Sequence, residues 1–188
     1  LSAHTLYRNE MRKPYFVDKT AMLEELFPLI REGSNYICVT RPRRFGKTVI
    51  ANMISSFFGK GADSHEIFDR LSIADAKEYR EYLNQWNVIH ISFNEMPDPC
   101  ENYSQYIQRI RKRLVRDLET VYGQSRMDEN DAVWDILSEI YETTGGEKFI
   151  FVLDEWDYIF HQDFAGEKDK KAFLLSLRNL QKDKPYIS

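Results

Sequence analysis

The stretch CVTRPRRFGKTVI, residues 38–50, contains residue types that bind phosphate. Within it, Gly46-Lys47-Thr48 matches the end of the phosphate-binding pattern G-x-x-x-x-G-K-[ST]. Arg41 stands where that pattern has its first glycine. In such a loop the glycine allows close backbone approach, the lysine reaches the β- and γ-phosphates, and the threonine hydroxyl binds Mg²⁺. The stretch therefore predicts a site for a nucleoside triphosphate and Mg²⁺. The alternative is a lysine and a threonine that open an ordinary surface helix.

Two carboxylates follow an apolar run later in the chain. In FIFVLDEWD, residues 149–157, the apolar residues end in Asp154 and Glu155. At the carboxyl end of a strand, Asp154 would hold Mg²⁺, directly or through water, and Glu155 would polarise the attacking water. The alternative is a buried strand that emerges into solvent at acidic residues. The strand–Gly-Lys-Thr–helix unit upstream favours the catalytic interpretation, with Glu155 and Lys47 as the catalytic residues.

The phosphate-loop segment is also rich in arginine. We assign the following residues to nucleotide binding: Arg41, Arg43, Arg44, Phe45, Gly46, Lys47 and Thr48. Pro42 restricts Arg41 to an extended geometry, and this rigid entry can replace a flexible glycine. For Arg43 and Arg44 two roles stay open, contact with phosphate or pairing with nearby carboxylates, because arginine serves both.

Strand and helix patterns predict that these motifs meet at one edge of a sheet. NYICVT (35–40) is expected to be a buried strand, and a helix is expected to begin near Lys47 and end at Gly59. KFIFVLDEWD (148–157) is expected to be a strand with an acidic end. A further strand, NVIHISFN (87–94), lies between these two. Such an inserted strand, with a Glu beside the magnesium Asp, indicates the ATPase branch of P-loop proteins by analogy between folds.

Short β-branched runs alternate with helical patterns along the whole chain. This alternation predicts an α/β fold with a mainly parallel central sheet. Asp18 can cap a helix that runs to Gly33 and that Pro28 kinks or splits. The other predicted helices cover 64–71, 75–86, 103–123, 133–144 and 168–183. In the helix over 103–123, one face is expected to carry Ile107, Ile110, Leu114, Leu118 and Val121.

Bulk composition limits the class of protein. The chain has 188 residues, of which 43% are hydrophobic, with a net charge of −4, and this predicts one globular domain over 1–188. Two cysteines are too few for a disulfide scaffold or a zinc site. No apolar run has the length of a membrane span and no signal peptide is evident, so the default expectation is a cytoplasmic protein without a membrane partner. Because the chain starts with Leu1 and stops at KPYIS, we expect it to be the N-terminal fragment of a longer protein.

A basic face lies on the helix predicted over 103–123. Four cations share it: Arg109, Lys112, Arg113 and Arg116. A nucleic-acid contact is one interpretation. A solvated face is favoured, because Asp117 and Glu119 follow and no aromatic residues are interleaved.

Four segments, in this order, resemble the AAA-ATPase-like family of bacteria and archaea: YFVDKTAMLEEL, TRPRRFGKTV, NVIHISFN and FIFVLDEWD. The resemblance extends from Tyr15 to the last predicted strand, and RPRRFGK[ST] is its most specific mark. An arginine at the first-glycine position is usual in that family, whereas Trp156 stands where tyrosine is common. The resemblance implies a P-loop NTPase three-layer fold, similar to signal-transduction-type ATPases, and a C-terminal nuclease-like domain is often attached.

Position by position, the resemblance implies Lys47 and Thr48 on phosphate and Mg²⁺, Asp154 on Mg²⁺, and Glu155 as the water-activating acid. The expected function is Mg²⁺-dependent ATP hydrolysis used as a conformational switch, with self-association or a C-terminal domain of the same protein as a further partner. The alternative is a non-catalytic nucleotide-binding or interaction module that regulates an attached nuclease-like domain or a DNA contact. The VDKT segment (17–20) is also a family mark, with packing near the adenine or against the phosphate loop as its suggested role.

Overall fold

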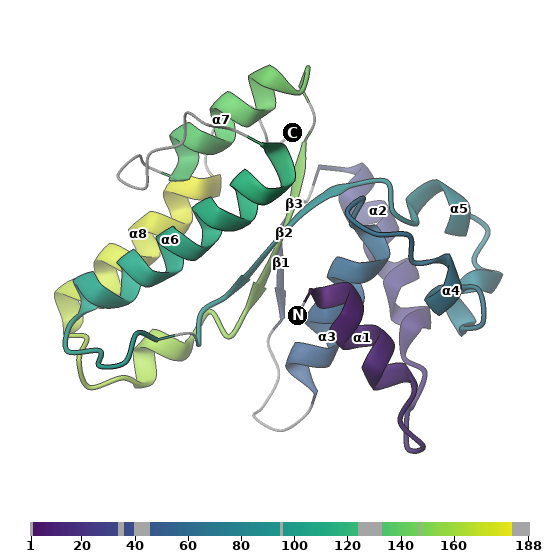
Figure 1. The fold of residues 1–188 in the computed structure, drawn as a ribbon, viewed down its shortest axis with the longest axis horizontal. Coiled ribbons are helices and arrows are strands. Elements are labelled where there is room, and N and C mark those ends of the chain that lie inside the picture. The colour runs from purple at the N-terminus through teal and green to yellow at the C-terminus, as the bar shows by residue number, and fades with distance from the viewer. Residues whose placement is uncertain are drawn as a thin grey trace. The chain divides into compact units, whose positions relative to one another are not determined.

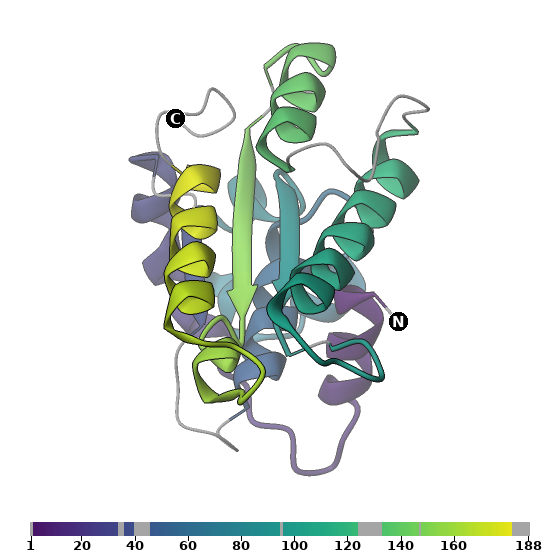
Figure 2. The same ribbon diagram turned by 90° about the vertical axis from the view of Figure 1, so that its left-hand side faces the viewer.

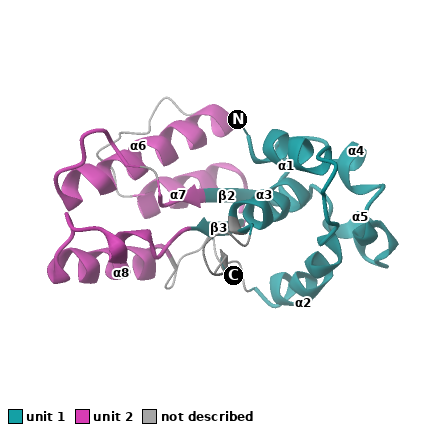
Figure 3. Ribbon diagram, turned by 90° about the horizontal axis from the view of Figure 1, so that it is seen from below, with its two compact units in different colours: residues 1–90, 149–154 teal, residues 91–148, 155–188 magenta. Residues whose placement is uncertain are grey.

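The structure is a computed structural model that describes residues 2–33, 36–39, 46–94, 96–123, 133–146 and 148–181. The chain divides into two compact units, drawn in different colours in Figure 3. Unit 1 comprises Leu1–His90 and Phe149–Asp154, and unit 2 comprises Ile91–Lys148 and Glu155–Ser188. Gly46-Lys47-Thr48 and Asp154 therefore belong to unit 1, and Glu155 is the first residue after the boundary.

The described strands form one sheet in the order β1-β3-β2, with β1 at Tyr36–Val39, β2 at Asn87–Ser92 and β3 at Phe149–Asp154. Strands β1 and β3 are parallel, and their register runs from Tyr36 opposite Phe151 to Val39 opposite Asp154. Figure 2 shows β3 beside β2. Strand β2 lies between β1 and β3 along the chain, as predicted, whereas in the sheet β3 is the central strand. All six β3 residues are buried, as a central strand requires, whereas burial alternates over the last residues of β2.

Unit 1 contains short helices around one long one. They are α1 (Ala3–Met11), the 3₁₀ helix η1 (Thr20–Glu25), α2 (Leu26–Arg31), α3 (Lys47–Phe58), α4 (His65–Phe68), the 3₁₀ helix η2 (Ser72–Asp75) and α5 (Tyr79–Tyr82). Helix α3 packs against α1, β1 and β3, and Figure 1 shows α1 and α3 side by side. The long helix therefore connects the N-terminal segment to the sheet.

Of the helices predicted in unit 1, the one over 64–71 is limited to α4, and the one over 18–33 is split, as expected, but ahead of Pro28. The helix expected from Asp18 to Gly33 is split into η1 and α2, and the split precedes Pro28, which lies in the first turn of α2, where a missing N–H is tolerated. The helix expected over 75–86 is reduced to α5. The chain after α5 instead turns toward the end of α3, where the Trp86 N–H donates to the Phe58 carbonyl at 2.9 Å.

The core of unit 1 is largely aromatic. The rings of Phe27 and Tyr82 stack with centroids 4.2 Å apart, and Phe57 and Phe58 of α3 meet edge to face at 4.9 Å. The buried Tyr82 hydroxyl donates to the Phe27 carbonyl at 3.2 Å, which satisfies a polar group that would otherwise be costly to bury. Apolar residues of η1, α2 and α3 lie in or against this core: Met22, Leu23, Leu26, Phe27 and Ile30 from the first two, and Val49, Ile50, Met53, Ile54 and Phe57 from α3.

Unit 2 contains α6 (Tyr103–Tyr122), α7 (Val133–Thr143), the 3₁₀ helix η3 (Tyr158–His161) and α8 (Glu167–Gln181), and α7 packs against both α6 and α8. The buried face of α6 includes Ile110, Leu114 and Leu118, as predicted. Two residues predicted for this face are not buried: Ile107 is half-buried, and the Val121 side chain is 68% exposed, because it lies one turn beyond the last buried residue of the helix. The four predicted cations of α6 are all exposed.

The mixed α/β architecture and the parallel pairing next to the central strand agree with the predicted fold class. The three-layer P-loop arrangement stays a prediction. Among the described residues, no helix combines the length and the apolar character that a membrane crossing demands.

Candidate functional site

The carboxyl ends of β1 and β3 meet at one edge of the unit 1 sheet. The parallel register places Val39, the last residue of β1, directly opposite Asp154, the last residue of β3. The chain leaves β1 after Val39 and opens α3 at Gly46-Lys47. The Gly-Lys-Thr segment therefore follows β1, the strand that pairs with β3. Both strands end at the sheet edge where open α/β folds bind ligands.

Gly46 begins α3 in a left-handed conformation, with φ 72° and ψ 28°. A side chain at this position would meet no atom of the described residues within 4 Å, and the left-handed backbone angle favours glycine. No side chain among the described residues caps this end of α3. The first N–H groups of a helix have no partner within the helix and carry partial positive charge, so this end of α3 suits an anion.

Lys47 and Thr48 are the first two residues of α3, and Thr48 is exposed. The other loop residues assigned to nucleotide binding, Arg41, Arg43, Arg44 and Phe45, lie outside the described residues. The structure thus describes the helical part of the predicted phosphate site and the strand next to it.

Asp154 is fully buried at the end of β3. Burying a carboxylate is costly unless other groups or a cation compensate its charge. Glu155, which follows directly, has φ 55°, a left-handed conformation that is uncommon for residues other than glycine. Its carbonyl accepts a hydrogen bond from the Tyr158 N–H at 2.9 Å, so the chain turns sharply immediately after the strand. Strained residues of this kind are concentrated at functional sites.

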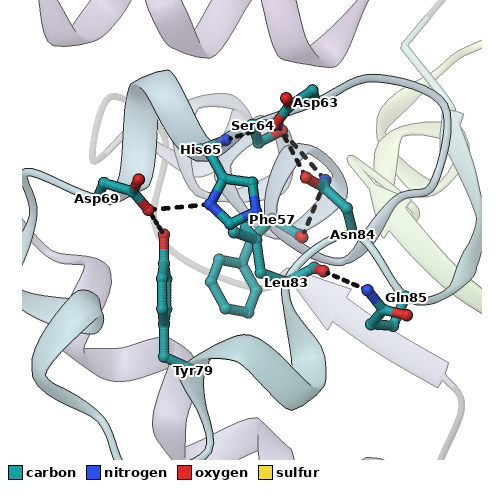
Figure 4. A network of polar contacts seen from close by, with 9 residues as sticks. All are labelled: Phe57, Asp63, Ser64, His65, Asp69, Tyr79, Leu83, Asn84 and Gln85. Carbon is teal, nitrogen blue, oxygen red and sulfur yellow. Dashed lines mark hydrogen bonds and ion pairs between the residues drawn. The ribbon is translucent and has the colours of Figure 1, made fainter.

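The opposite end of α3 is held by Asn84, and Figure 4 draws its contacts with Phe57 and Ser64. The Asn84 side-chain amide donates to the carbonyls of Gly59 at 2.8 Å and Ser56 at 3.2 Å, and its carbonyl oxygen accepts from the Ser64 N–H at 2.9 Å. Asn84 itself has φ 56°, which asparagine tolerates better than most residues. These bonds satisfy carbonyls that the last turn of a helix leaves without partners, and so fix where α3 ends.

Asp18 connects two helices of unit 1. One carboxylate oxygen accepts from the Thr20 N–H at 2.8 Å and the Thr20 hydroxyl at 2.6 Å. The other accepts from the Ser72 N–H at 2.7 Å and the Ser72 hydroxyl at 2.5 Å. Partial burial acts to raise the pKa of Asp18, but the hydrogen bonds from Ser72 and Thr20 outweigh it and lower the pKa to about 2. Asp18 therefore acts as an anionic clamp between the starts of η1 and η2.

A comparison with protein families places this site in context. The model of the family described as "Predicted AAA-ATPase" matches residues 7–183. The chain belongs to the AAA-ATPase-like family. The match includes the start of α3 and the end of β3, and the family description suggests a nucleotide-binding role for an AAA-ATPase-like chain.

One curated relative is described as "Uncharacterized protein in vnfD 5'region", from Azotobacter chroococcum mcd 1. It is 25% identical over 166 residues, which cover 88% of this chain and 30% of the relative. The chain thus spans less than a third of the length of this relative. No solved structure matches the chain significantly.

Two features of this AAA-ATPase-like chain were missed from the sequence. Helix α1 begins after Ser2, whose hydroxyl accepts from the Thr5 N–H at 3.3 Å, but only Tyr7 of this helix is fully buried, so its apolar periodicity is weak. The second missed feature is Asn84, whose side chain bonds to the Gly59 carbonyl at the end of α3, 25 residues earlier in the chain. Its one local signal is that asparagine tolerates the left-handed turn that ends α5.

Proposed function

We propose that the protein binds MgATP at the β1–β3 edge of unit 1 and hydrolyses it as a conformational switch. The observation that carries this proposal is the parallel register that sets Asp154 opposite Val39, where the chain leaves for the Gly-Lys-Thr start of α3. The start of α3, the proposed phosphate-binding element, follows β1 along the chain. Asp154 ends β3, the strand that pairs with β1 in unit 1. The family membership supports the same class of ligand.

Each residue of this edge has a proposed role. The N–H groups at the start of α3 hold phosphate oxygens, Gly46 lets the phosphates approach the backbone, and Lys47 neutralises charge on the β- and γ-phosphates. The Thr48 hydroxyl and the Asp154 carboxylate are oxygen donors of the type that Mg²⁺ prefers, so this donor set fits the ion. When bound, Mg²⁺ would offset the negative charge of the β- and γ-phosphates.

Glu155 is the proposed catalytic base. Its carboxylate would orient the attacking water and polarise it toward the γ-phosphate. The left-handed backbone of Glu155, directly after the buried Asp154, supports a position set by the end of β3 rather than by a flexible loop.

Substitution of Glu155 by glutamine tests this role. The change keeps the size of the side chain and removes its basicity, so Glu155→Gln is expected to bind MgATP with unchanged affinity and to lose turnover. Asp157→Asn is the matched control, because Asp157 is an acidic residue two positions after Glu155. Its carboxylate oxygen lies 3.8 Å from the Nε2 atom of His161. Phosphate release is measured for the native protein and both variants, with MgATP affinity measured by calorimetry.

Normal turnover by Glu155→Gln would refute the assignment of the base. A native protein that binds MgATP but never releases phosphate would instead identify a non-catalytic nucleotide-binding module.

A further inference from the structure

Three polar residues form a line along α3 that begins in its first turn. Thr48, Asn52 and Ser55 are separated by four and then three residues, so their side chains share one face of the helix. Thr48 is exposed, whereas Asn52 and Ser55 are buried. Because side chains of a helix lean toward its N-terminus, the Asn52 side chain leans toward Thr48, the proposed ligand of Mg²⁺.

The far end of this line contacts the sheet of unit 1. The Ser55 hydroxyl oxygen lies 3.2 Å from the Nδ1 atom of His90 in β2, the strand next to β3. On β3, Ile150 and Val152 belong to the core that α3 also enters. Side chains alternate along a strand, so Asp154 faces the same side of the sheet as these two residues. The polar line of α3 and the Asp154 carboxylate are therefore on the same side of the sheet.

Asn52 differs from the other buried polar residues of α3. Ser55 is hydrogen-bonded to His90 and Ser56 to Ser64. The Asn52 side chain is only 7% exposed, and among the residues that the structure describes its amide has no hydrogen-bond partner. Nearly all buried polar groups in proteins are hydrogen-bonded, because a buried group without a partner is costly. The Asn52 amide is thus available to a group at the start of α3.

The Thr48 hydroxyl lacks the partner that helical hydroxyl groups normally have. In this protein Thr120 of α6 donates to the carbonyl four residues earlier at 2.8 Å, and Ser176 of α8 does so at 3.0 Å. Thr48 is the second residue of α3, so the residue four positions earlier lies before the helix, and the Thr48 hydroxyl makes no hydrogen bond within the described ranges. Of its neighbours on the next turn, Ala51 has no polar side-chain atom and Asn52 has an amide oxygen.

We propose that Asn52 is a positioning residue for Thr48, a proposal that rests on the MgATP site proposed above. With MgATP bound, the Asn52 amide oxygen accepts the proton of the Thr48 hydroxyl, which turns a lone pair of the hydroxyl oxygen toward the ion. Partners of metal ligands commonly set ligand orientation in this way. The same bond gives the buried amide an acceptor role that it lacks without the nucleotide. Asn52 thus acts through Thr48 and touches neither ATP nor Mg²⁺.

The test measures how strongly Mg²⁺ supports ATP binding. Calorimetry gives the affinity for ATP with Mg²⁺ and with EDTA, and the ratio of the two affinities is the Mg²⁺ gain. Asn52→Leu removes the amide at nearly constant size, Asn52→Ala removes it with a smaller side chain, and Asn52→Asp keeps an acceptor oxygen. Asn9→Leu is the matched control, because Asn9 is an exposed asparagine of α1 in the same unit. Thermal melts without ligand check that each variant is folded.

Asn52→Leu and Asn52→Ala are expected to lower the Mg²⁺ gain by about tenfold or more, with the affinity for metal-free ATP unchanged. Asn52→Asp is expected to keep the Mg²⁺ gain, and Asn9→Leu to behave like the native protein. The melting temperature of ligand-free Asn52→Leu should not fall, because the substitution removes a buried amide that has no partner. In a Thr48→Ala background, Asn52→Leu should cause no further loss, because the two residues act as one unit.

A native Mg²⁺ gain in Asn52→Leu would overturn the role of Asn52. The same conclusion follows if Asn52→Asp loses as much as Asn52→Leu, if Asn52→Leu weakens ATP binding equally with and without Mg²⁺, or if it adds a further loss to Thr48→Ala. The failure of the underlying site has a different signature. If the native protein binds no ATP, or if Thr48→Ala leaves its Mg²⁺ gain unchanged, the MgATP site itself fails and the role of Asn52 with it.

Discussion

Replacement of Asp18 by asparagine should destabilise unit 1 in a pH-dependent manner. The Asp18 carboxylate accepts four hydrogen bonds, from the N–H and hydroxyl groups of Thr20 and Ser72. Asparagine keeps one acceptor oxygen, but its amide cannot accept the bond from the Ser72 N–H. The variant therefore leaves the start of η2 without its cap and releases the clamp between η1 and η2.

The magnitude follows from the pKa of Asp18. Hydrogen bonding lowers this pKa from 3.8 to about 2, and each unit corresponds to about 1.4 kcal/mol of stability. Because the side chain is largely exposed, solvent screening reduces the full value of about 2.5 kcal/mol to about 1–1.5 kcal/mol. Since the folded-state pKa is depressed, this stabilisation is present above about pH 4 and is lost as the pH falls through about 2.

The assay is urea denaturation of the native protein and Asp18→Asn between pH 7 and pH 2. The native protein should be more stable by about 1–1.5 kcal/mol at pH 7, and the difference should shrink progressively below pH 4. Glu10→Gln is the control, because Glu10 forms a surface ion pair with Lys13 across one helical turn and such pairs contribute less than about 1 kcal/mol. Equal stability of the native protein and Asp18→Asn at pH 7, or a difference that persists unchanged to pH 2, would refute this reasoning.

Two further substitutions test how α3 is held at its ends. Asn84→Ala should lower the free energy of unfolding by about 2–3 kcal/mol, because it removes the amide bonds to the end of α3 and places alanine at φ 56°. Asn84→Gly should recover about 1 kcal/mol of this loss, because glycine adopts that φ without strain but restores no hydrogen bond. Chemical denaturation measures both, and an Asn84→Ala variant as stable as the native protein would contradict the proposed anchor. Gly46→Ala should cost about 1–2 kcal/mol in a thermal melt, because the φ of 72° is strained for alanine, whereas the added methyl group would meet no atom of the described residues within 4 Å. A loss far above that range would show that Gly46 is tightly packed.

Much of the edge around the site could be predicted from local sequence signals. The strand at the acidic motif and the bounds of α3 follow from an uninterrupted apolar run and from a helix that begins after Gly46 and ends before Gly59. These signals are strong because each depends on neighbouring residues alone. The residues 41 to 45, which the phosphate-loop pattern also includes, lie outside the described structure, and their roles stay predictions.

The features that could not be predicted depend on contacts between distant residues. Strand β3 is central, and its residues are buried on both faces. The order of the strands along the chain does not show which strand lies in the middle of the sheet. Helix α5 is short because the chain from Asn84 to Trp86 bonds to the end of α3 instead of continuing a helix. The bond from the Ser72 N–H to Asp18 likewise joins residues 54 positions apart in the chain, and no local pattern predicts such a pair.

The affinity for MgATP tests the central claim most directly. Calorimetry should show that the native protein binds MgATP, that Lys47→Ala loses about tenfold or more in affinity, and that Lys77→Ala, a charge-matched change at an exposed lysine elsewhere in unit 1, binds like the native protein. A native protein that does not bind MgATP, or a Lys47→Ala variant with native affinity, would contradict the assignment of a nucleotide site to the start of α3.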